Sequence, residues 1–316
     1  MVALTGAGCG YVGDPLPPLA NVPGHIADLA VVQRGGRLLA HFTVPPNTTE
    51  GLPIQTPLRL DLRIGTAVPD FTPAAWAESA RPVQPVSVKN GLAEYDIPAS
   101  TWAGKEVTIA ARAIGANGKD SGWSPFINLL VTPPPAAPAD VKTAATPDGV
   151  KVTWQGPAGE YHVLRRAGDE KSFSPVASVS ANEWLDRAAE FGKPYTYVVQ
   201  RTVPAGNRVA ESELSDPASI TPKDTFPPAP PTGLRALGGT NSVELTWERN
   251  PEPDLAGYRV YRASGDDPFA RLADVSQLPA YSDHNVEAGK TYRYRITALD
   301  QAGNESGPSA LAAAGT

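Results

Sequence analysis

Four glycines near the N-terminus have a spacing that suits phosphate binding. Gly6, Gly8, Gly10 and Gly13 contain the pattern G-x-G-x-x-G, which in a βαβ unit cradles a dinucleotide. That chemistry needs a preceding buried strand and a following helix whose N–H groups face the pyrophosphate. Only five residues precede Gly6, and the prolines of 14–18 ("DPLPP") prevent a helix. We therefore expect no bound cofactor.

Other side chains that perform catalysis or bind metals are scattered along the sequence. Four histidines lie far apart, at His25, His41, His162 and His284. Without i,i+4 spacing or a second cysteine they do not indicate a zinc site. The carboxylates of "NPEPD" (250–254) and "SGDDP" (264–268) lack an Asp-x-Asp-x-Asp-Gly loop, so we interpret them as solvated turns rather than calcium ligands. With no G-x-S-x-G elbow either, we predict no catalytic residue, no metal site and no enzymatic activity.

Cys9 is the only cysteine among 316 residues, so an intramolecular disulfide is excluded. The run Ala7-Gly8-Cys9 precedes a Pro-rich stretch and resembles the lipobox of bacterial lipoproteins. The resemblance implies that Cys9 is acylated and that residues 1–23 tether the protein to a membrane. Gly6 stands where that family usually has leucine, and a start codon placed too far downstream would explain the short preceding segment. The alternative is a Gly-rich terminus with an accidental thiol.

The composition excludes two further classes of protein. The formal net charge is −6, the predicted pI is near 5.3, and no long basic run is present, so nucleic acid is not an expected partner. No apolar stretch reaches 18 residues, so no segment is expected to span a membrane. Any membrane attachment would therefore depend on a lipid at Cys9.

Two Pro-rich stretches, 132–138 and 224–231, divide the chain into three segments. The second and third segments repeat each other: "GVKVTW" (149–154) matches "SVELTW" (242–247), "EYHVLRR" (160–166) matches "GYRVYRA" (257–263), "EWLD" (183–186) matches "AYSD" (280–283), and "FGKPYTYVVQR" (191–201) matches "AGKTYRYRITA" (288–298). Their period-two alternation predicts antiparallel strands. About seven short strands in each roughly ninety-residue segment indicate a two-sheet sandwich.

The third segment carries "PPAPPTGLRAL", Trp247, "NPEPDLAGYRVYRA" and "GKTYRYRITALDQAGNESGPS", and it resembles fibronectin type III domains. The resemblance implies that Trp154 and Trp247 fill the core between two sheets. It also implies that Tyr195 and Tyr292 are tyrosine corners, whose hydroxyls bond to nearby backbone. We predict an all-β protein of three tandem fibronectin-type-III (immunoglobulin-like) β-sandwiches joined by Pro-rich linkers. The predicted domains are 24–132, 138–222 and 228–316.

The first segment is a divergent copy with an insertion. Phe42 stands at the tryptophan position, Val107 replaces the corner tyrosine, and about twenty extra residues fall near 66–88. That stretch contains Phe71 and Trp76. Because loops on rigid sandwiches commonly carry binding residues, we predict that these two aromatic side chains contact a partner. The alternative is that they fold back to cover the core.

These features predict a non-catalytic cell-envelope protein, attached to a membrane through a lipid on Cys9 and facing the periplasm or the exterior at the outer membrane or cell surface. It would bind a protein partner in the envelope or act as a spacer or structural subunit. The alternative is an accessory carbohydrate-binding or spacer chain of an extracellular polysaccharide-degrading system, with polysaccharide as the partner. Pro-rich linkers predict that each module keeps its own stability.

Overall fold

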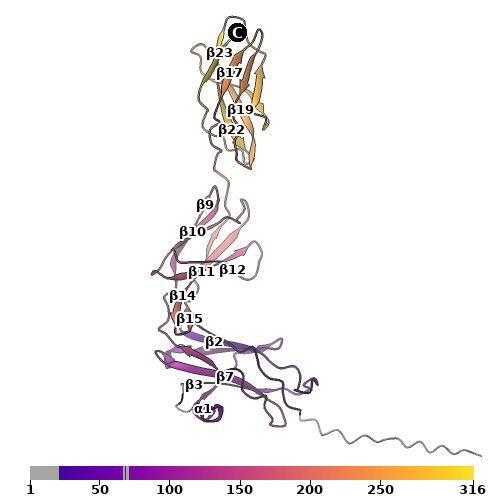
Figure 1. The fold of residues 1–316 in the computed structure, drawn as a ribbon, viewed down its shortest axis with the longest axis vertical. Coiled ribbons are helices and arrows are strands. Elements are labelled where there is room, and N and C mark those ends of the chain that lie inside the picture. Colours follow the sequence, from indigo (N-terminus) through magenta and orange to yellow (C-terminus); the bar gives the residue numbers. More distant parts are fainter. Residues whose placement is uncertain (1–20, 67, 69–70) are drawn as a thin grey trace, which may run out of the picture.

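The computed structural model describes residues 21–66, 68 and 71–316. Cys9 and the predicted tether up to residue 20 lie outside the described residues. Nearly all of the regular secondary structure in the described chain is β-strand, and the chain forms three bodies arranged in an elongated row (Figure 1). Among the described residues, no helix has the length and apolar character needed to cross a membrane.

The first module contains two four-stranded sheets and the insertion. Its elements are β1 (Ala30–Arg34), β2 (Arg37–Thr43), β3 (Arg59–Thr66), α1 (Pro73–Ser79), β4 (Arg81–Val83), β5 (Ser87–Lys89), β6 (Leu92–Pro98), the 3₁₀-helix η1 (Ala99–Trp102), β7 (Glu106–Ile114) and β8 (Ile127–Leu130). The strand order is β1-β2-β6-β5 in one sheet and β4-β3-β7-β8 in the other. The insertion therefore supplies α1 and the edge strands β4 and β5.

The second and third modules share one plan. The second consists of β9 (Ala139–Thr146), β10 (Gly149–Gln155), β11 (Glu160–Ala167), β12 (Ser174–Val179), β13 (Glu183–Asp186), β14 (Tyr195–Ala205), β15 (Arg208–Glu211) and β16 (Ala218–Ile220). The third consists of β17 (Arg235–Gly238), β18 (Val243–Thr246), β19 (Leu255–Ser264), β20 (Ala270–Val275), β21 (Ala280–Asp283), β22 (Thr291–Asp300) and β23 (Ala312–Gly315). In both, a three-stranded sheet (β13-β10-β9 or β17-β18-β21) faces a larger sheet.

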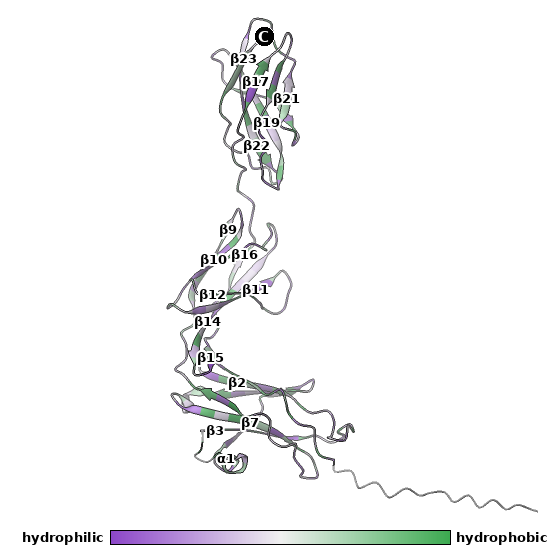
Figure 2. Ribbon diagram, in the orientation of Figure 1, coloured by the Kyte–Doolittle hydropathy of each residue, from purple (hydrophilic) through white to green (hydrophobic). Residues whose placement is uncertain are grey.

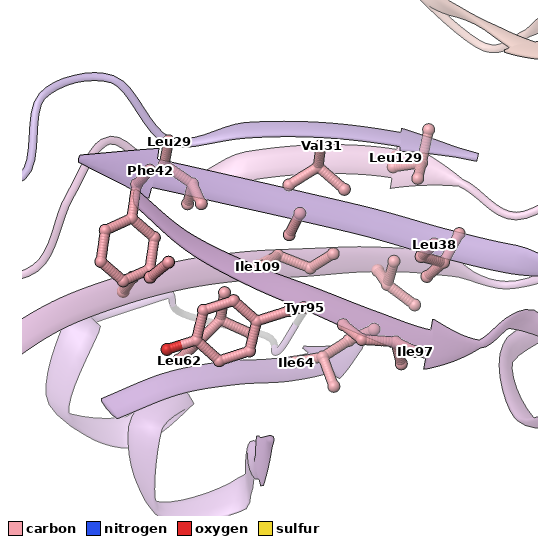
Figure 3. Close-up of a cluster of buried hydrophobic side chains, with 14 of the residues drawn as sticks. Leu29, Val31, Leu38, Phe42, Leu62, Ile64, Tyr95, Ile97, Ile109 and Leu129 are labelled. Atoms are coloured by element: carbon pink, nitrogen blue, oxygen red, sulfur yellow. The ribbon is translucent and has the colours of Figure 1, made fainter. Parts of the chain in front are cut away.

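Each module has its own hydrophobic core, because alternate side chains of each strand point between its sheets. Hydrophobic and hydrophilic residues alternate along many of the strands (Figure 2). In the first module, side chains from both sheets meet in one buried cluster (Figure 3). Phe42 is fully buried there and stacks on Tyr95 with ring centroids 5.7 Å apart. A phenyl ring thus occupies the core position that tryptophan holds in the other modules.

The predicted core and corner residues of the second and third modules are confirmed. Trp154 and Trp247 are buried, and each packs edge-on against a core tyrosine. The hydroxyl of Tyr195 accepts a hydrogen bond from the backbone N–H of Glu190 at 3.0 Å. Tyr292 accepts the same bond from Glu287, also at 3.0 Å. These two corners hold the chain that leads from one sheet to the other.

Val107 is fully buried in the first module, where a corner tyrosine would stand. A different arrangement closes this corner. The 3₁₀-helix η1 places Trp102 against the core, and the backbone N–H of Lys105 donates to the Trp102 carbonyl at 2.9 Å. The N–H of Gly104, whose φ of 76° favours glycine, donates to Val131 at 2.8 Å.

The sheets of the first two modules are continuous, which the Pro-rich stretch between them did not predict. Strand β15 of the second module lies beside β1 of the first, giving the order β12-β11-β14-β15-β1-β2-β6-β5. The remaining strand of this nine-stranded sheet, β16, pairs with β14. Figure 1 shows β14 and β15 reaching toward the sheet of the first module.

Candidate functional site

The insertion of the first module was predicted to carry a binding site, and the structure corrects the role of Trp76. Its side chain has 0% exposure, so it does not reach a partner. It lies on the outer face of the sheet that contains β3 and β7, not in the core between the sheets. There it packs edge-on against Trp123 and Phe126, with centroids 5.4 and 5.1 Å away, and against Ala80 and Ala110.

Local sequence explains why Trp76 reaches this outer face. Thr72 caps α1, because its hydroxyl accepts a hydrogen bond from the N–H of Ala75 at 3.2 Å, and Pro73 opens the first turn. Gly65 gives the helix room on strand β3. A Cβ at Gly65 would lie 3.1 Å from the Ala80 Cβ and 3.2 Å from the Trp76 Nε1. The alternative, that the two aromatic side chains fold back to cover the core, is correct only in that Trp76 is buried against its own module, because Trp76 packs in a separate cluster on the outer face of the sheet.

Two arginines and an aspartate form a network beside this cluster, and both arginines contact the ring of Trp123. Arg112 lies over the ring of Trp123 at 4.4 Å, and Arg63 lies over the same ring at 5.9 Å. The buried carboxylate of Asp61 accepts a hydrogen bond from the Nε of each arginine at 3.0 Å. Because each of these two arginines has both a carboxylate and a ring as partners, this group of side chains stabilises the outer face of the sheet.

Phe71 is the exposed member of the insertion. Its side chain is 45% exposed, and its ring meets the half-buried Phe126 edge-on at 5.1 Å. An exposed aromatic ring supported by a packed neighbour suits an interface. Of the two predicted binding residues, Phe71 therefore keeps that role as a candidate.

Three aspartates form a close group in the described part of the chain. Oxygen atoms of Asp224, Asp254 and Asp300 lie within 4.8 Å of one another. Asn304 bridges two of them: its side-chain amide donates to Asp300 at 2.8 Å and to Asp224 at 3.4 Å, and its backbone N–H donates to Asp300 at 2.8 Å. The bridge joins the chain before the third module to the turn that follows β22. Asp254 belongs to "NPEPD", and sequence reasoning missed this association.

Two further networks, which sequence reasoning also missed, occupy equivalent buried places. Asp186, at the end of β13, accepts hydrogen bonds from Tyr197 at 2.8 Å and Arg165 at 2.7 Å. Asp283, at the end of β21, accepts them from Tyr294 and Arg262, both at 2.9 Å. Burial, and then the neighbouring carboxylate, raises the pKa of Tyr197 and of Tyr294 well above its usual range. The shared final Asp of "EWLD" and "AYSD" was the available signal.

These networks hold the sheets together and have no geometry for catalysis. Each carboxylate is paired with an arginine and closed off from solvent. The four histidines lie on different elements or loops, and none belongs to a cluster of metal-ligating side chains in the described ranges. The two buried networks therefore serve to join the sheets of the second and third modules.

No protein-family profile matches this sequence. Exoglucanase B of Cellulomonas fimi is 29% identical over 214 residues, which is 63% of this chain and 19% of that protein. Amylopullulanase of Thermoanaerobacterium thermosulfurigenes is 32% identical over 88 residues, 28% of this chain and 5% of that protein. Poly(3-hydroxybutyrate) depolymerase of Ralstonia pickettii is 39% identical over 87 residues, 27% of this chain and 16% of that protein. The chain thus spans a fifth or less of these curated relatives.

Among the similar solved structures, one of bacterial origin is covered over almost its whole length. It is an Fn3-like protein from Clostridium thermocellum, 32% identical, with 28% of this chain aligned to 92% of that chain and a TM-score of 0.25. The chain belongs to the fibronectin type III family. The predicted tandem arrangement is confirmed, and the tyrosine corners described above fit this family. The FN1-FN3 domains of chicken CNTN1 cover 92% of this fibronectin type III chain, with 17% identity and a TM-score of 0.30.

Proposed function

We propose that this chain is a non-catalytic accessory chain of an extracellular polymer-degrading system, where its modules set the distance and orientation between the parts they join. The observation that carries the proposal is the match to exoglucanase B, because its 214 residues extend over more than one module. Matches to an amylopullulanase and a poly(3-hydroxybutyrate) depolymerase support the same class of system. The comparisons therefore favour the accessory alternative over an envelope-binding subunit.

Spacing is better supported than sugar binding by the placement of the aromatic side chains. A ring that stacks on a sugar must present an open face. Four tryptophans are buried, namely Trp76, Trp102, Trp154 and Trp247. The remaining two, Trp123 and Trp184, are only partly exposed, and both pack against hydrophobic clusters. The chain therefore lacks a row of open tryptophan rings, and we assign it a structural role.

Co-sedimentation tests this assignment. The purified chain is mixed with an insoluble glucan and, separately, with poly(3-hydroxybutyrate) granules, and the bound fraction is measured as a function of polymer concentration. A spacer stays in the supernatant, as a bovine albumin control does. Saturable retention would favour polymer binding instead. If retention occurred and the Phe71→Ala variant lost it, the exposed aromatic ring would be the contact.

We also propose that a lipid on Cys9 attaches the chain to a membrane, on the strength of the Ala7-Gly8-Cys9 run. Two or more acyl chains give stable attachment. The test expresses the gene with its upstream region and compares wild type with Cys9→Ser in membrane and soluble fractions. Loss of membrane association in the variant supports the anchor, and equal membrane association of both proteins contradicts it. Either outcome is compatible with a spacing role.

A further inference from the structure

The hairpin of β14 and β15 projects beyond the sandwich to which it belongs. Strand β14 pairs with β11 only as far as Thr202, which lies opposite Glu160. Beyond that point β14 pairs with β15 alone, and the turn at Gly206 joins the two strands. We call residues 203–211 the strap. The hydrophobic core cluster of the second module does not include these residues, because on β14 it ends at Val199.

The strap closes an edge of the first module. Strand β15 lies parallel to β1, with Ala210 opposite Gln33 and Glu211 opposite Arg34. The N–H of Gly35 donates to the Glu211 carbonyl at 2.8 Å. An unpaired edge strand exposes a row of backbone donors and acceptors, so this pairing covers groups on β1 that would otherwise face solvent. Backbone pairing also fixes the register and angle between the two strands.

Side chains of β1 and of the strap add hydrogen bonds at the junction between the first two modules. Both the Nε and a terminal nitrogen of Arg34 donate to the same Glu211 oxygen, at 2.9 and 2.8 Å, where the pair is partly shielded from solvent. The fully buried Gln33 holds the start of the linker, because its amide donates to the Thr132 carbonyl at 2.8 Å and accepts from the Thr132 N–H at 3.0 Å. Arg208, on the strap, donates to the Asn128 carbonyl at 3.1 Å.

The third module has no such contact with its neighbour. Its sheets, β17-β18-β21 and β20-β19-β22-β23, include no strand from another module. Residues 221–234, which lead into it, contain no strand. The second module is thus joined very differently to its two neighbours.

We propose that the strap fuses the first two modules into a single rigid elbow that folds as one unit, while the third module folds on its own. Domains joined only by a linker and a small interface move relative to each other. A continuous sheet with a partly buried ion pair between Arg34 and Glu211 opposes that motion, because rotation would break backbone bonds and separate the paired groups. The inference concerns the geometry of the chain and stands independently of the proposed function.

Distances between spin labels test the elbow. In a Cys9→Ser background, cysteines replace the exposed Lys89 of the first module and the exposed Asp169 of the second, and pulsed electron resonance gives their distance distribution. We expect one narrow distribution. In the unlocked variant Gln33→Ala/Arg34→Ala/Glu211→Ala we expect it to broaden severalfold. Lys151→Ala is the matched control, because it removes an exposed ion pair with Glu183 of the second module, away from the strap, and should leave the distribution unchanged.

A second measurement covers the case in which the unlocked variant fails to fold. Val199→Ala weakens the second core without touching the strap, and hydrogen exchange of β1 amides is compared with that in wild type. If the first two modules unfold as one cooperative unit, the β1 amides of the first module should exchange faster in Val199→Ala than in wild type. A broad wild-type distance distribution would overturn the proposal. So would β1 exchange that is indifferent to Val199→Ala.

Discussion

Tyr294 donates a hydrogen bond of 2.9 Å to Asp283, and the bond crosses from one sheet of the third module to the other. Tyr294 lies on β22, whereas Asp283 ends β21 in the opposing sheet. Arg262 neutralises the carboxylate from β19 and also lies over the ring of Tyr292 at 4.9 Å. A buried charge with all its partners in place therefore links the sheets near the tyrosine corner.

Removing the carboxylate should destabilise the third module strongly. Asp283→Ala removes the carboxylate bonded to Arg262, which keeps the Asn285 carbonyl as a partner, and it also removes the acceptor of the buried Tyr294 hydroxyl. Breaking a buried pair of this kind costs about 3–5 kcal/mol. Tyr294→Phe removes one hydrogen bond and should cost about 1–3 kcal/mol. Urea denaturation measures both. Lys290→Ala, which removes an exposed ion pair with Glu287, is the control and should cost under about 1 kcal/mol. An Asp283→Ala variant as stable as this control would refute the structural role.

Replacing the two core tryptophans should lower the thermal stability of different numbers of modules. Replacing either Trp154 or Trp247 with Ala should cost about 3–5 kcal/mol, as for other large-to-small core changes. Trp247→Ala should lower the melting of the third module alone. Because of the strap, Trp154→Ala should lower the melting of the first module as well as the second. Calorimetry of the whole chain resolves these transitions, and a first module unaffected by Trp154→Ala would argue for independent modules.

Replacing Trp76 should destabilise the first module much more than replacing Phe71. Trp76→Ala empties the cluster on the outer face of the first module and should cost about 3–5 kcal/mol. Phe71→Ala removes a half-exposed ring and should cost at most about 1 kcal/mol. Thermal unfolding compares the two variants. Equal losses of stability would mean that Phe71 is part of the folded cluster rather than a surface for partners.

Alkaline pH should unfold the protein through its buried tyrosines. Burial, and then a neighbouring aspartate, raises the pKa of Tyr95, Tyr197 and Tyr294, one in each module. In the unfolded chain these phenols ionise near pH 10, so their contribution is complete below that pH. It falls as the pH rises from about 10 toward the raised folded values, by about 1.4 kcal/mol per pH unit for each tyrosine.

Denaturation between pH 9 and pH 11.5 measures this dependence, with Tyr294→Phe as the comparison. The Tyr294→Phe variant should be less stable than wild type at neutral pH. Above about pH 10, the free energy of unfolding of its third module should fall less steeply with pH than in wild type, because the phenol is missing. A stability that stays constant above pH 10 in the wild-type protein would be inconsistent with phenols held in the neutral form.

Local patterns in the sequence were sufficient to predict the sandwiches. Period-two alternation located the strands, and the repeat between the second and third segments identified Trp154, Trp247, Tyr195 and Tyr292. These positions are set by contacts within one module, so a repeated motif marks them. The glycines and polar residues of "GANGKDSG" (115–122) are typical of a turn, and the structure forms one there, in which Ile114 bridges Asp120 and Gly118 has a φ of 77°.

Features that depend on contacts between distant segments were not predicted. Nothing near Gln33 or Ala210 indicates that their strands pair, because they are far apart in sequence and the junction between modules is not repeated elsewhere in the chain. The burial of Trp76 depends on Gly65, because the missing side chain at Gly65 lets the helix pack on the outer face of the sheet. An aromatic residue in an insertion signals burial or binding equally well until the surface beneath it is known.

Exchange of segments in a relative tests the spacer role most directly. The stretch of Cellulomonas fimi exoglucanase B that matches this chain is replaced by the chain, by a Gly/Ser segment of equal length, or deleted, and hydrolysis of insoluble and soluble glucan is measured. A spacer role predicts that only the chain preserves the parent's rate on insoluble glucan, while all variants act equally on soluble glucan. If the chain performs no better than the flexible segment or the deletion on insoluble glucan, the spacer role is contradicted.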